Sequence, residues 1–303
     1  MFKELVEKLR KGRFISLETT PAHLPTIDPL LDKIKKYNLL EFIDGFSTTD
    51  NPLAKLKYNS ILAAIKLQQQ FKKPVIATIS MRDRNKLALQ SDLLGANDFD
   101  IRAILALTGD SAKISDQPNT KGVFEADSTL LLDIIKCFNG GIDYSGKPFK
   151  IKPKKIYPFA VSSSFAKNPK TLIKKFQKKI EHEAVGIITQ PVFSIENAKM
   201  LIELFYETRE KYSNEKAKTE LILGFFPITK LRTAQFLHSH VPGINVPKEW
   251  IDKLHKASKI SENEEFRVGL DKSKTLFNQI LNLHPKIHIM SANRFDLVKK
   301  ILE

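Results

Sequence analysis

The sequence has one cysteine and no long hydrophobic segment, and both absences exclude classes of protein. Cys137 alone cannot form an internal disulfide or a multi-cysteine metal site. So little cysteine suits a reducing compartment, and we expect a cytoplasmic protein. No apolar run approaches the ~20 residues that a membrane helix needs, and residues 1–10 lack the apolar core of a signal peptide. We therefore expect no membrane partner.

Several binding signatures are missing as well. No Gly-x-Gly-x-x-Gly follows the first predicted strand, and no Walker A lysine motif occurs anywhere. Zinc-finger spacing, an RRM-like aromatic signature and a basic low-complexity tail are also lacking. These absences argue against a Rossmann domain, a P-loop NTPase and a nucleic-acid partner.

Positive charge, in contrast, is in excess. The chain of 303 residues has 49 lysines and arginines against 34 acidic residues, a net charge of +15. Such a field attracts polyanions such as nucleic acid, acidic lipid, or a polycarboxylate or phosphate ligand. The lysines are spread along predicted helices, which favours a solvated surface over a nucleic-acid site.

Strand and helix signals alternate along the whole chain. The predicted strands cover residues 14–19, 42–48, 74–80, 103–110 with its final turn, 156–162, 186–190, 221–227 and 286–291. The helices between them include residues 2–11, 28–37, about 51–72, 127–138, 169–183 and 195–213, with two or three more in 230–281. Eight such units predict a single (β/α)8 TIM barrel over residues 1–303. A doubly wound open sheet is the alternative.

Polar residues follow the predicted strands, and in a barrel all these ends face one mouth. Glu18 interrupts an apolar strand, and it is either a general acid or the partner of a lysine or arginine on a nearby loop. Asp110 follows the turn residue Gly109, and it is either a site residue or a cap of the next segment. The seven histidines do not cluster at strand ends, so we expect no metal site. Ser162 has no evident histidine partner, which argues against a hydrolase.

Whole phrases of the sequence, in order, resemble the methylenetetrahydrofolate reductase family. The resemblance covers essentially the whole chain and places matches at six strand ends. The matching phrases are residues 14–21, Thr48-Thr49-Asp50-Asn51-Pro52, residues 82–85 with 89–96, Leu105-Ala106-Leu107-Thr108-Gly109-Asp110, Ile188-Thr189-Gln190-Pro191 and Asn293-Arg294.

This resemblance implies an FAD-dependent barrel that makes 5-methyltetrahydrofolate, a methyl donor for methionine synthesis, from 5,10-methylenetetrahydrofolate. Hydride would pass from NADH or NADPH through FAD by ping-pong exchange, in a homo-oligomer. Glu18 would donate a proton and Asp110 would lie near flavin and folate. Ser47, Gln190 and Arg294 would bind substrate. The implied FAD contacts are Thr78, Leu107, Thr108, Gly109, Asp110, Phe124, Ser162, Asn168, Lys178 and Lys179.

Some positions depart from the family pattern. The residue that aligns near the nicotinamide-stacking aromatic is Leu231, which leaves the electron donor open. The alternatives are a subunit that takes electrons from a partner protein and a folate-binding barrel without hydride transfer. The net charge of +15 suggests that a basic rim attracts the polyglutamate tail of folates, although a generally lysine-rich surface explains it equally.

Overall fold

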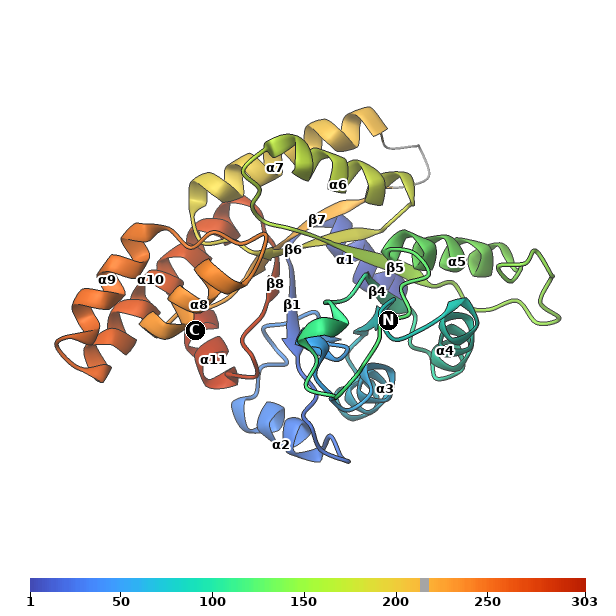
Figure 1. Ribbon diagram of the computed structural model, residues 1–303, viewed down its shortest axis with the longest axis horizontal. Coiled ribbons are helices and arrows are strands. Elements are labelled where there is room, and N and C mark those ends of the chain that lie inside the picture. Colours follow the sequence, from blue (N-terminus) through green and yellow to red (C-terminus); the bar gives the residue numbers. More distant parts are fainter. Residues whose placement is uncertain (213–217) are drawn as a thin grey trace.

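In residues 1–212 and 218–303, which the computed structural model describes, eight parallel strands close into a barrel in sequence order. Figure 1 shows helices arranged around these strands. The last strand pairs with the first, and this closure sets Ser16 beside His288. The strands are β1 (Phe14–Thr19), β2 (Gly45–Thr48), β3 (Val75–Ser80), β4 (Ala103–Leu107), β5 (Tyr157–Ser162), β6 (Gly186–Pro191), β7 (Glu220–Phe225) and β8 (Lys286–Ile289). The predicted (β/α)8 barrel is therefore confirmed.

The helices bury their apolar faces against the outside of the barrel. Several begin where the sequence supplies a cap: Asp127 accepts from the backbone of Thr129, and Asn168 from that of Lys170. The helices are α1 (Phe2–Lys11), α2 (Asp28–Tyr37), α3 (Ser60–Phe71), α4 (Lys86–Asp98), α5 (Ser128–Gly140), α6 (Pro169–Glu181), α7 (Ile195–Tyr212), α8 (Leu231–His240), α9 (Lys248–Ser258), α10 (Glu262–Leu283) and α11 (Phe295–Leu302).

One end of the barrel is closed by α1. Its residues Phe2, Leu5, Val6 and Leu9 are buried in a cluster with inward-facing side chains of the strands, among them Phe159. This apolar plug fills the interior of the barrel at the amino-terminal end of the strands. The carboxyl ends, where the polar residues gather, remain for binding.

Two predicted boundaries were wrong. The second strand begins at Gly45, because residues 40–42 form a turn and the chain bends at Asp44. The Asp44 carboxylate accepts from the backbone N–H of Ile15 at 2.8 Å. The helix predicted from residue 51 is instead a short 3-10 turn, η1 (Pro52–Ala54), followed by irregular chain, and α3 starts only at Ser60. Leu53 and Ala54 have positive φ angles of 56° and 54°, which an α-helix does not allow.

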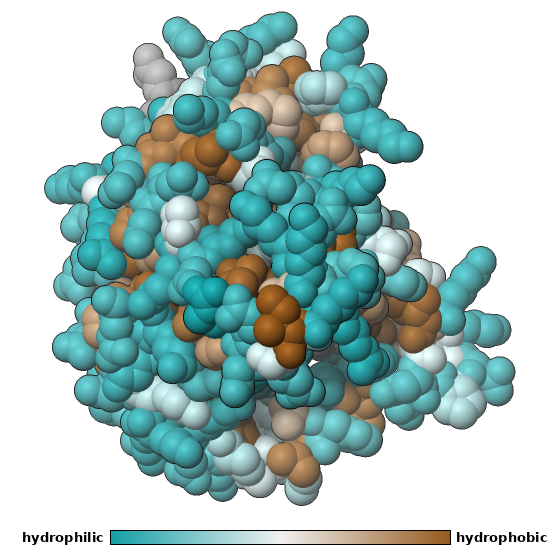
Figure 2. Space-filling model, turned by 90° about the vertical axis from the view of Figure 1, so that its left-hand side faces the viewer, coloured by the Kyte–Doolittle hydropathy of each residue, from teal (hydrophilic) through white to brown (hydrophobic). Residues whose placement is uncertain are grey.

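The segment between β7 and β8 contains α8, α9 and α10, which form a group on one side of the barrel (Figure 1). The surface on that side is mainly hydrophilic, with separate hydrophobic patches (Figure 2). No helix in the described ranges is long and apolar enough to cross a lipid bilayer.

Candidate active site

A cavity of about 380 Å³ opens at the carboxyl ends of the strands. Its walls come from five or more different strands and the turns that follow them, so distant parts of the sequence meet there. The lining residues are Glu18, Thr49, Asp50, Pro52, Thr78, Arg82, Leu105, Leu107, Thr108, Gly109, Asp110, Val161, Ile188, Thr189, Gln190, His288 and Met290. Charged, amide and imidazole groups thus share one space with apolar walls, as in most small-molecule sites.

Glu18 extends from the end of β1 into this cavity, and its side chain is 24% exposed. Its closest charged neighbour is His288, whose Nε2 lies 3.9 Å from Glu18 Oε2. None of the lysines and arginines that the structure describes lies within 4 Å of this carboxylate. The alternative of a salt bridge to a nearby basic loop residue is therefore wrong, and the carboxyl group is available to a ligand.

Asp110 holds a neighbouring loop in place at the mouth. Its Oδ2 accepts a hydrogen bond of 2.7 Å from the backbone N–H of Leu53, in the turn after β2. Gly109 permits this arrangement with a φ of 92°, and a Cβ there would lie 2.3 Å from Ser80 Oγ. The next short helix, η2 (Ala112–Ile114), is capped by Ser111, so Asp110 does not serve as that cap. One oxygen of Asp110 thus orders the mouth, and the side chain still lines the cavity.

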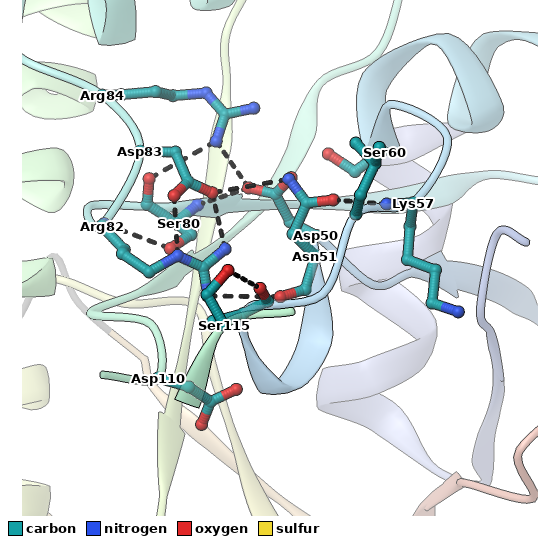
Figure 3. A network of polar contacts seen from close by, with 12 residues as sticks. Asp50, Asn51, Lys57, Ser60, Ser80, Arg82, Asp83, Arg84, Asp110 and Ser115 are labelled. Atoms are coloured by element: carbon teal, nitrogen blue, oxygen red, sulfur yellow. Dashed lines mark hydrogen bonds and ion pairs between the residues drawn. The ribbon is translucent and has the colours of Figure 1, made fainter. Parts of the chain in front are cut away.

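A buried network of ion pairs supports the turns after β2 and β3 (Figure 3). Asp50 accepts from Arg84 at 2.6 Å and from the backbone N–H of Ser80 at 2.9 Å. Arg82 bonds to Asp83 at 2.6 Å and to the carbonyl of Asn51. The hydrogen bonds to Asp83 raise the pKa of Arg82 above its ordinary value, although burial opposes this. Arg82 therefore stays protonated at the cavity wall, with its charge paired to Asp83.

A second cavity of about 290 Å³ adjoins the first and shares Thr108, Val161 and Gln190 with it. Its other side is basic, because Lys175, Lys178 and Lys179 of α6 line it. A carboxylate, Asp127, also lines it and pairs with Lys178. Burial raises the pKa of Asp127, but hydrogen bonds from Lys178 and Thr129 outweigh burial and hold it below the ordinary value.

Lys179 is the unusual member of this basic group. It is only 8% exposed, and its Nζ donates to Ser128 Oγ at 2.6 Å. Burial lowers its pKa to about 8, although Asp127 acts in the opposite direction. Lys175, in contrast, is exposed and donates to Ser163 Oγ at 2.6 Å. The charged form of a partly desolvated ammonium group is stabilised by a bound anion, so this end of the site suits a phosphate group.

Two buried polar atoms at the junction of the cavities have no hydrogen-bond partner among the residues that the structure describes. They are Ser162 Oγ on β5 and Gln190 Oε1 on β6. Buried polar atoms are rarely left unpaired unless a ligand or water satisfies them. These two atoms and the basic end fit a polar, anionic group such as FAD. Within the described ranges, no three His, Cys, Asp or Glu side chains are grouped as metal ligands.

The structure brings most of the predicted residues together. Those that line the first cavity are Glu18, Thr78, Leu107, Thr108, Gly109, Asp110 and Gln190. Ser162, Lys178 and Lys179 line the second cavity. The remaining four line neither cavity. Ser47 is buried on β2 beside His288, Arg294 pairs with Asp296, Phe124 is exposed in the chain before α5, and Asn168 caps α6.

Several cavity residues are not identified by the sequence pattern, among them His288, Arg82 and Lys175. His288 stands between two isoleucines in β8, and its own position is the only signal. Arg82 belongs to a phrase that matches the family, and Lys175 to a lysine-rich run, so neither is distinguished as a cavity residue. The alternation of the strand predicts an inward direction for His288, but only barrel closure shows that it meets Glu18.

Comparison with known proteins agrees with this geometry. A family model described as methylenetetrahydrofolate reductase matches residues 2–303. The chain belongs to this family. Members of this family are folate-related oxidoreductases, and we assign this chain to that general kind. No curated protein matches the chain in sequence.

Two solved structures show the same fold. One is an uncharacterized protein from Clostridium thermocellum that binds two copies of 5-methyl-5,6,7,8-tetrahydrofolic acid, with a TM-score of 0.63 and 14% identity. That alignment covers 99% of this chain and 96% of the other. The second is DmoA from Hyphomicrobium sulfonivorans, with a TM-score of 0.57, 8% identity and coverage of 96% and 86%. At these identities the likeness extends to the fold alone.

Proposed function

We propose that this protein is a flavoprotein reductase that converts 5,10-methylenetetrahydrofolate to 5-methyltetrahydrofolate, with hydride from NADH or NADPH through FAD. The observation that carries the proposal is the meeting of Glu18, Asp110 and Gln190 in one cavity from three separate strand ends. The family match supports it, and so does the fold shared with a protein that binds 5-methyltetrahydrofolate. The product would supply methyl groups for methionine synthesis.

The methylene bridge must open before it accepts hydride, and opening requires a proton on the leaving nitrogen. Glu18 is the acid in this proposal, because its carboxyl group faces the cavity without a lysine or arginine within 4 Å in the described structure. A lysine or arginine there would hold the group as a carboxylate at neutral pH without supplying a proton. Leu105, Ile188 and Met290 form apolar walls of the same cavity.

Ring opening leaves a cationic iminium, and Asp110 offers a fixed negative charge to it. Its Oδ2 is already bonded to the backbone of Leu53, so the carboxylate is oriented before the ligand arrives. Fixed charge of this kind stabilises a developing charge without reorganisation. The unpaired Oε1 of Gln190 is a hydrogen-bond acceptor for an N–H of folate or for the nicotinamide amide.

FAD would be held across the two cavities by Thr108, Ser162, Gln190 and the lysines of α6. When bound, it supplies hydride transfer. Lys178 and Lys179 would contact its pyrophosphate. Gly109 would form part of the wall, because the lack of a Cβ lets this turn pack against Ser80 and Arg82. Ser162 Oγ would gain the hydrogen bond that it lacks in the described structure.

A second candidate is a reductase that receives electrons from a partner protein. No Phe, Tyr or Trp ring lines either cavity in the described part of the chain, so no such ring is placed to stack on nicotinamide. Leu231, at the start of α8, donates its backbone N–H to Glu265 at 2.7 Å and is outside the cavity linings. The folate half of the reaction is the same in both candidates.

An absorbance spectrum of the purified protein, repeated after anaerobic addition of NADH and then of NADPH, tests the proposal. We expect oxidised-flavin bands that bleach with one of the nucleotides. In another outcome, neither nucleotide reduces the flavin, but dithionite does, and methylenetetrahydrofolate then reoxidises it. That outcome would favour the partner-protein candidate. A protein that takes up no flavin when incubated with FAD would overturn both candidates.

Glu18→Gln separates the two half-reactions. The variant keeps the size of the side chain but cannot donate a carboxyl proton, so folate reduction should fall by about 10²-fold or more. Flavin reduction by the electron donor should change less than about threefold, because it needs no proton on folate. Glu41→Gln, at an exposed glutamate outside the site, is the matched control. Equal losses in both half-reactions would make Glu18 a structural residue.

A further inference from the structure

His288 is an imidazole group buried at the base of the cavity. It is 1% exposed and lies on β8, between β1 and β7. Its Nδ1 is 2.7 Å from Ser16 Oγ, and its Nε2 is 3.4 Å from Ser47 Oγ and 3.9 Å from Glu18 Oε2. The ring is thus fixed at one nitrogen and faces the proposed acid with the other.

Both of the serine contacts allow either protonation state of the ring. A hydroxyl donates or accepts, so Ser16 can donate to a bare Nδ1 or accept from Nδ1–H. Ser47 offers the same choice at Nε2, and the strand register places Ser47 directly beside Glu18. The Glu18 carboxyl group needs to move by only about 1 Å to bond directly to Nε2. The surroundings therefore permit a proton to be on His288 or on Glu18.

The other charged groups of the cavity are already paired away from this ring. Asp50 bonds to Arg84, Arg82 to Asp83, and Asp110 to the backbone of the turn after β2. On β7 the register partner of His288 is Gly224, which has no side chain. Within the described ranges, Glu18 is the one carboxylate within 4 Å of the His288 ring nitrogens.

We propose that His288 and Glu18 form one proton-holding pair, in which His288 is a positioning residue that keeps the proton available to Glu18. This inference rests on the proposed function, because it gives the acid of that reaction its proton. In water a glutamate releases its proton about two pH units below a histidine. An imidazole can therefore still hold a proton at a pH where a glutamate in water has lost it. Nε2 of His288 is near enough to Glu18 Oε2, at 3.9 Å, to pass that proton on after a small side-chain movement.

The proton balance of one turnover is simple. Before turnover the pair holds one proton, on Nε2 of His288 beside the Glu18 carboxylate. That proton passes to the carboxylate, which leaves His288 neutral. Glu18 then gives it to the leaving nitrogen of folate and is a carboxylate again. After the product leaves, Glu18 is reached by solvent through the cavity and returns a proton to the pair.

The pH profile of His288→Gln tests the pair. Glutamine can bond to both serines but cannot carry a proton, so the pH at which folate reduction falls to half should drop by at least one unit. The profile of flavin reduction should not move. His255→Gln, at an exposed histidine on α9, is the control. A variant with the wild-type profile and a uniformly lower rate would show that His288 is only structural.

A second readout needs neither flavin nor activity. NMR titration of the His288 ring in the apoprotein should show a midpoint that falls by at least half a pH unit in Glu18→Gln, because the variant has no carboxylate to favour the imidazolium. An unchanged midpoint would overturn the pair even if the reductase assay succeeds. A shifted midpoint in a protein that binds no flavin would support the pair and contradict the proposed function instead. His288→Asn repeats the activity test if the glutamine variant fails to fold.

Discussion

Lys179 shows how one residue can reduce stability and favour a ligand. Its folded pKa of about 8 is below the ordinary value of 10.5, because burial disfavours the ammonium form. The unfolded chain therefore binds this proton more tightly than the folded chain does. The contribution of Lys179 to stability is unfavourable at pH 7, and it becomes less so as the pH rises through 8 towards 10.5.

Replacing Lys179 with methionine should raise the melting temperature of the apoprotein at pH 7, by roughly 2–4 °C. The gain should shrink when the measurement is repeated near pH 10, because wild-type Lys179 is then neutral. FAD affinity should fall by about tenfold or more, since a desolvated cation is lost from the proposed phosphate end. Calorimetry and flavin titration measure the two effects.

Lys174→Met is the matched control for that experiment, because Lys174 is exposed on the same helix. It should change neither the melting temperature beyond about 1 °C nor flavin affinity. A Lys179→Met protein that is destabilised at pH 7 and binds FAD normally would mean that Lys179 is a structural donor to Ser128.

Glu18, Asp110 and Gln190 share one property: each interrupts or follows an apolar strand with a polar group. The structure brings all three to one cavity. His288 also interrupts an apolar strand, but the sequence does not show which residue it meets. It meets Glu18 only because β8 closes against β1, across a separation of 272 residues from Ser16, its hydrogen-bond partner. Contacts made by closure depend on the whole fold and not on local pattern.

At the level of elements, the strands were predictable because parallel strands in a barrel are buried on both faces and appear as apolar runs. The segment after β2 was not predictable in the same way. Proline after Asn51 indicates a helix start, but the backbone turns into the left-handed region at Leu53 and Ala54. The N–H of Leu53 bonds to Asp110, so a contact from β4 decides this conformation.

The segment between α8 and α9 positions two site residues, and Gly243 is its critical residue. Its carbonyl accepts from the backbone N–H groups of Ser164 and Phe165 at 3.0 and 2.9 Å. Its φ is 80°, and a Cβ there would lie 2.5 Å from Gln190 Oε1 and 2.6 Å from Ser163 Oγ. The absence of a side chain therefore leaves Gln190 free to face the cavity.

Gly243→Ala should destabilise the protein by about 1 kcal/mol through its positive φ and should also displace Gln190. We expect the KM for folate to rise several-fold. Flavin affinity should fall less, because Thr108, Ser162 and the lysines of α6 remain in place. Gly141→Ala is the control, because Gly141 has a φ of 90° and lies after α5, where an added Cβ meets only lysine side-chain atoms at 3.6 Å or more. If both variants lose the same stability and neither changes the KM, the segment between α8 and α9 has no role in ligand binding.

At the level of the whole molecule, the net charge of +15 acts over distances that single contacts do not reach. Some of this charge is at the site, because Lys175, Lys178 and Lys179 line the second cavity. The rest is spread over the helices and the mainly hydrophilic outer surface (Figure 2). A ligand with several negative charges would be attracted both by the lysines of the second cavity and by the basic outer surface.

A folate with a polyglutamate tail is such a ligand, and its KM at low salt should be at least several-fold below that of the monoglutamate. The advantage should disappear near 1 M salt, where the screening length falls to about 3 Å from about 10 Å at 0.1 M. The monoglutamate is the internal control, because it has the same pterin ring and fewer charges. A KM ratio near one at every salt concentration would mean that the basic surface serves solubility and not substrate capture. A KM ratio that persists at high salt would instead indicate direct contacts between the protein and the tail. Charge reversal at Lys175 would then test whether that lysine makes one of these contacts.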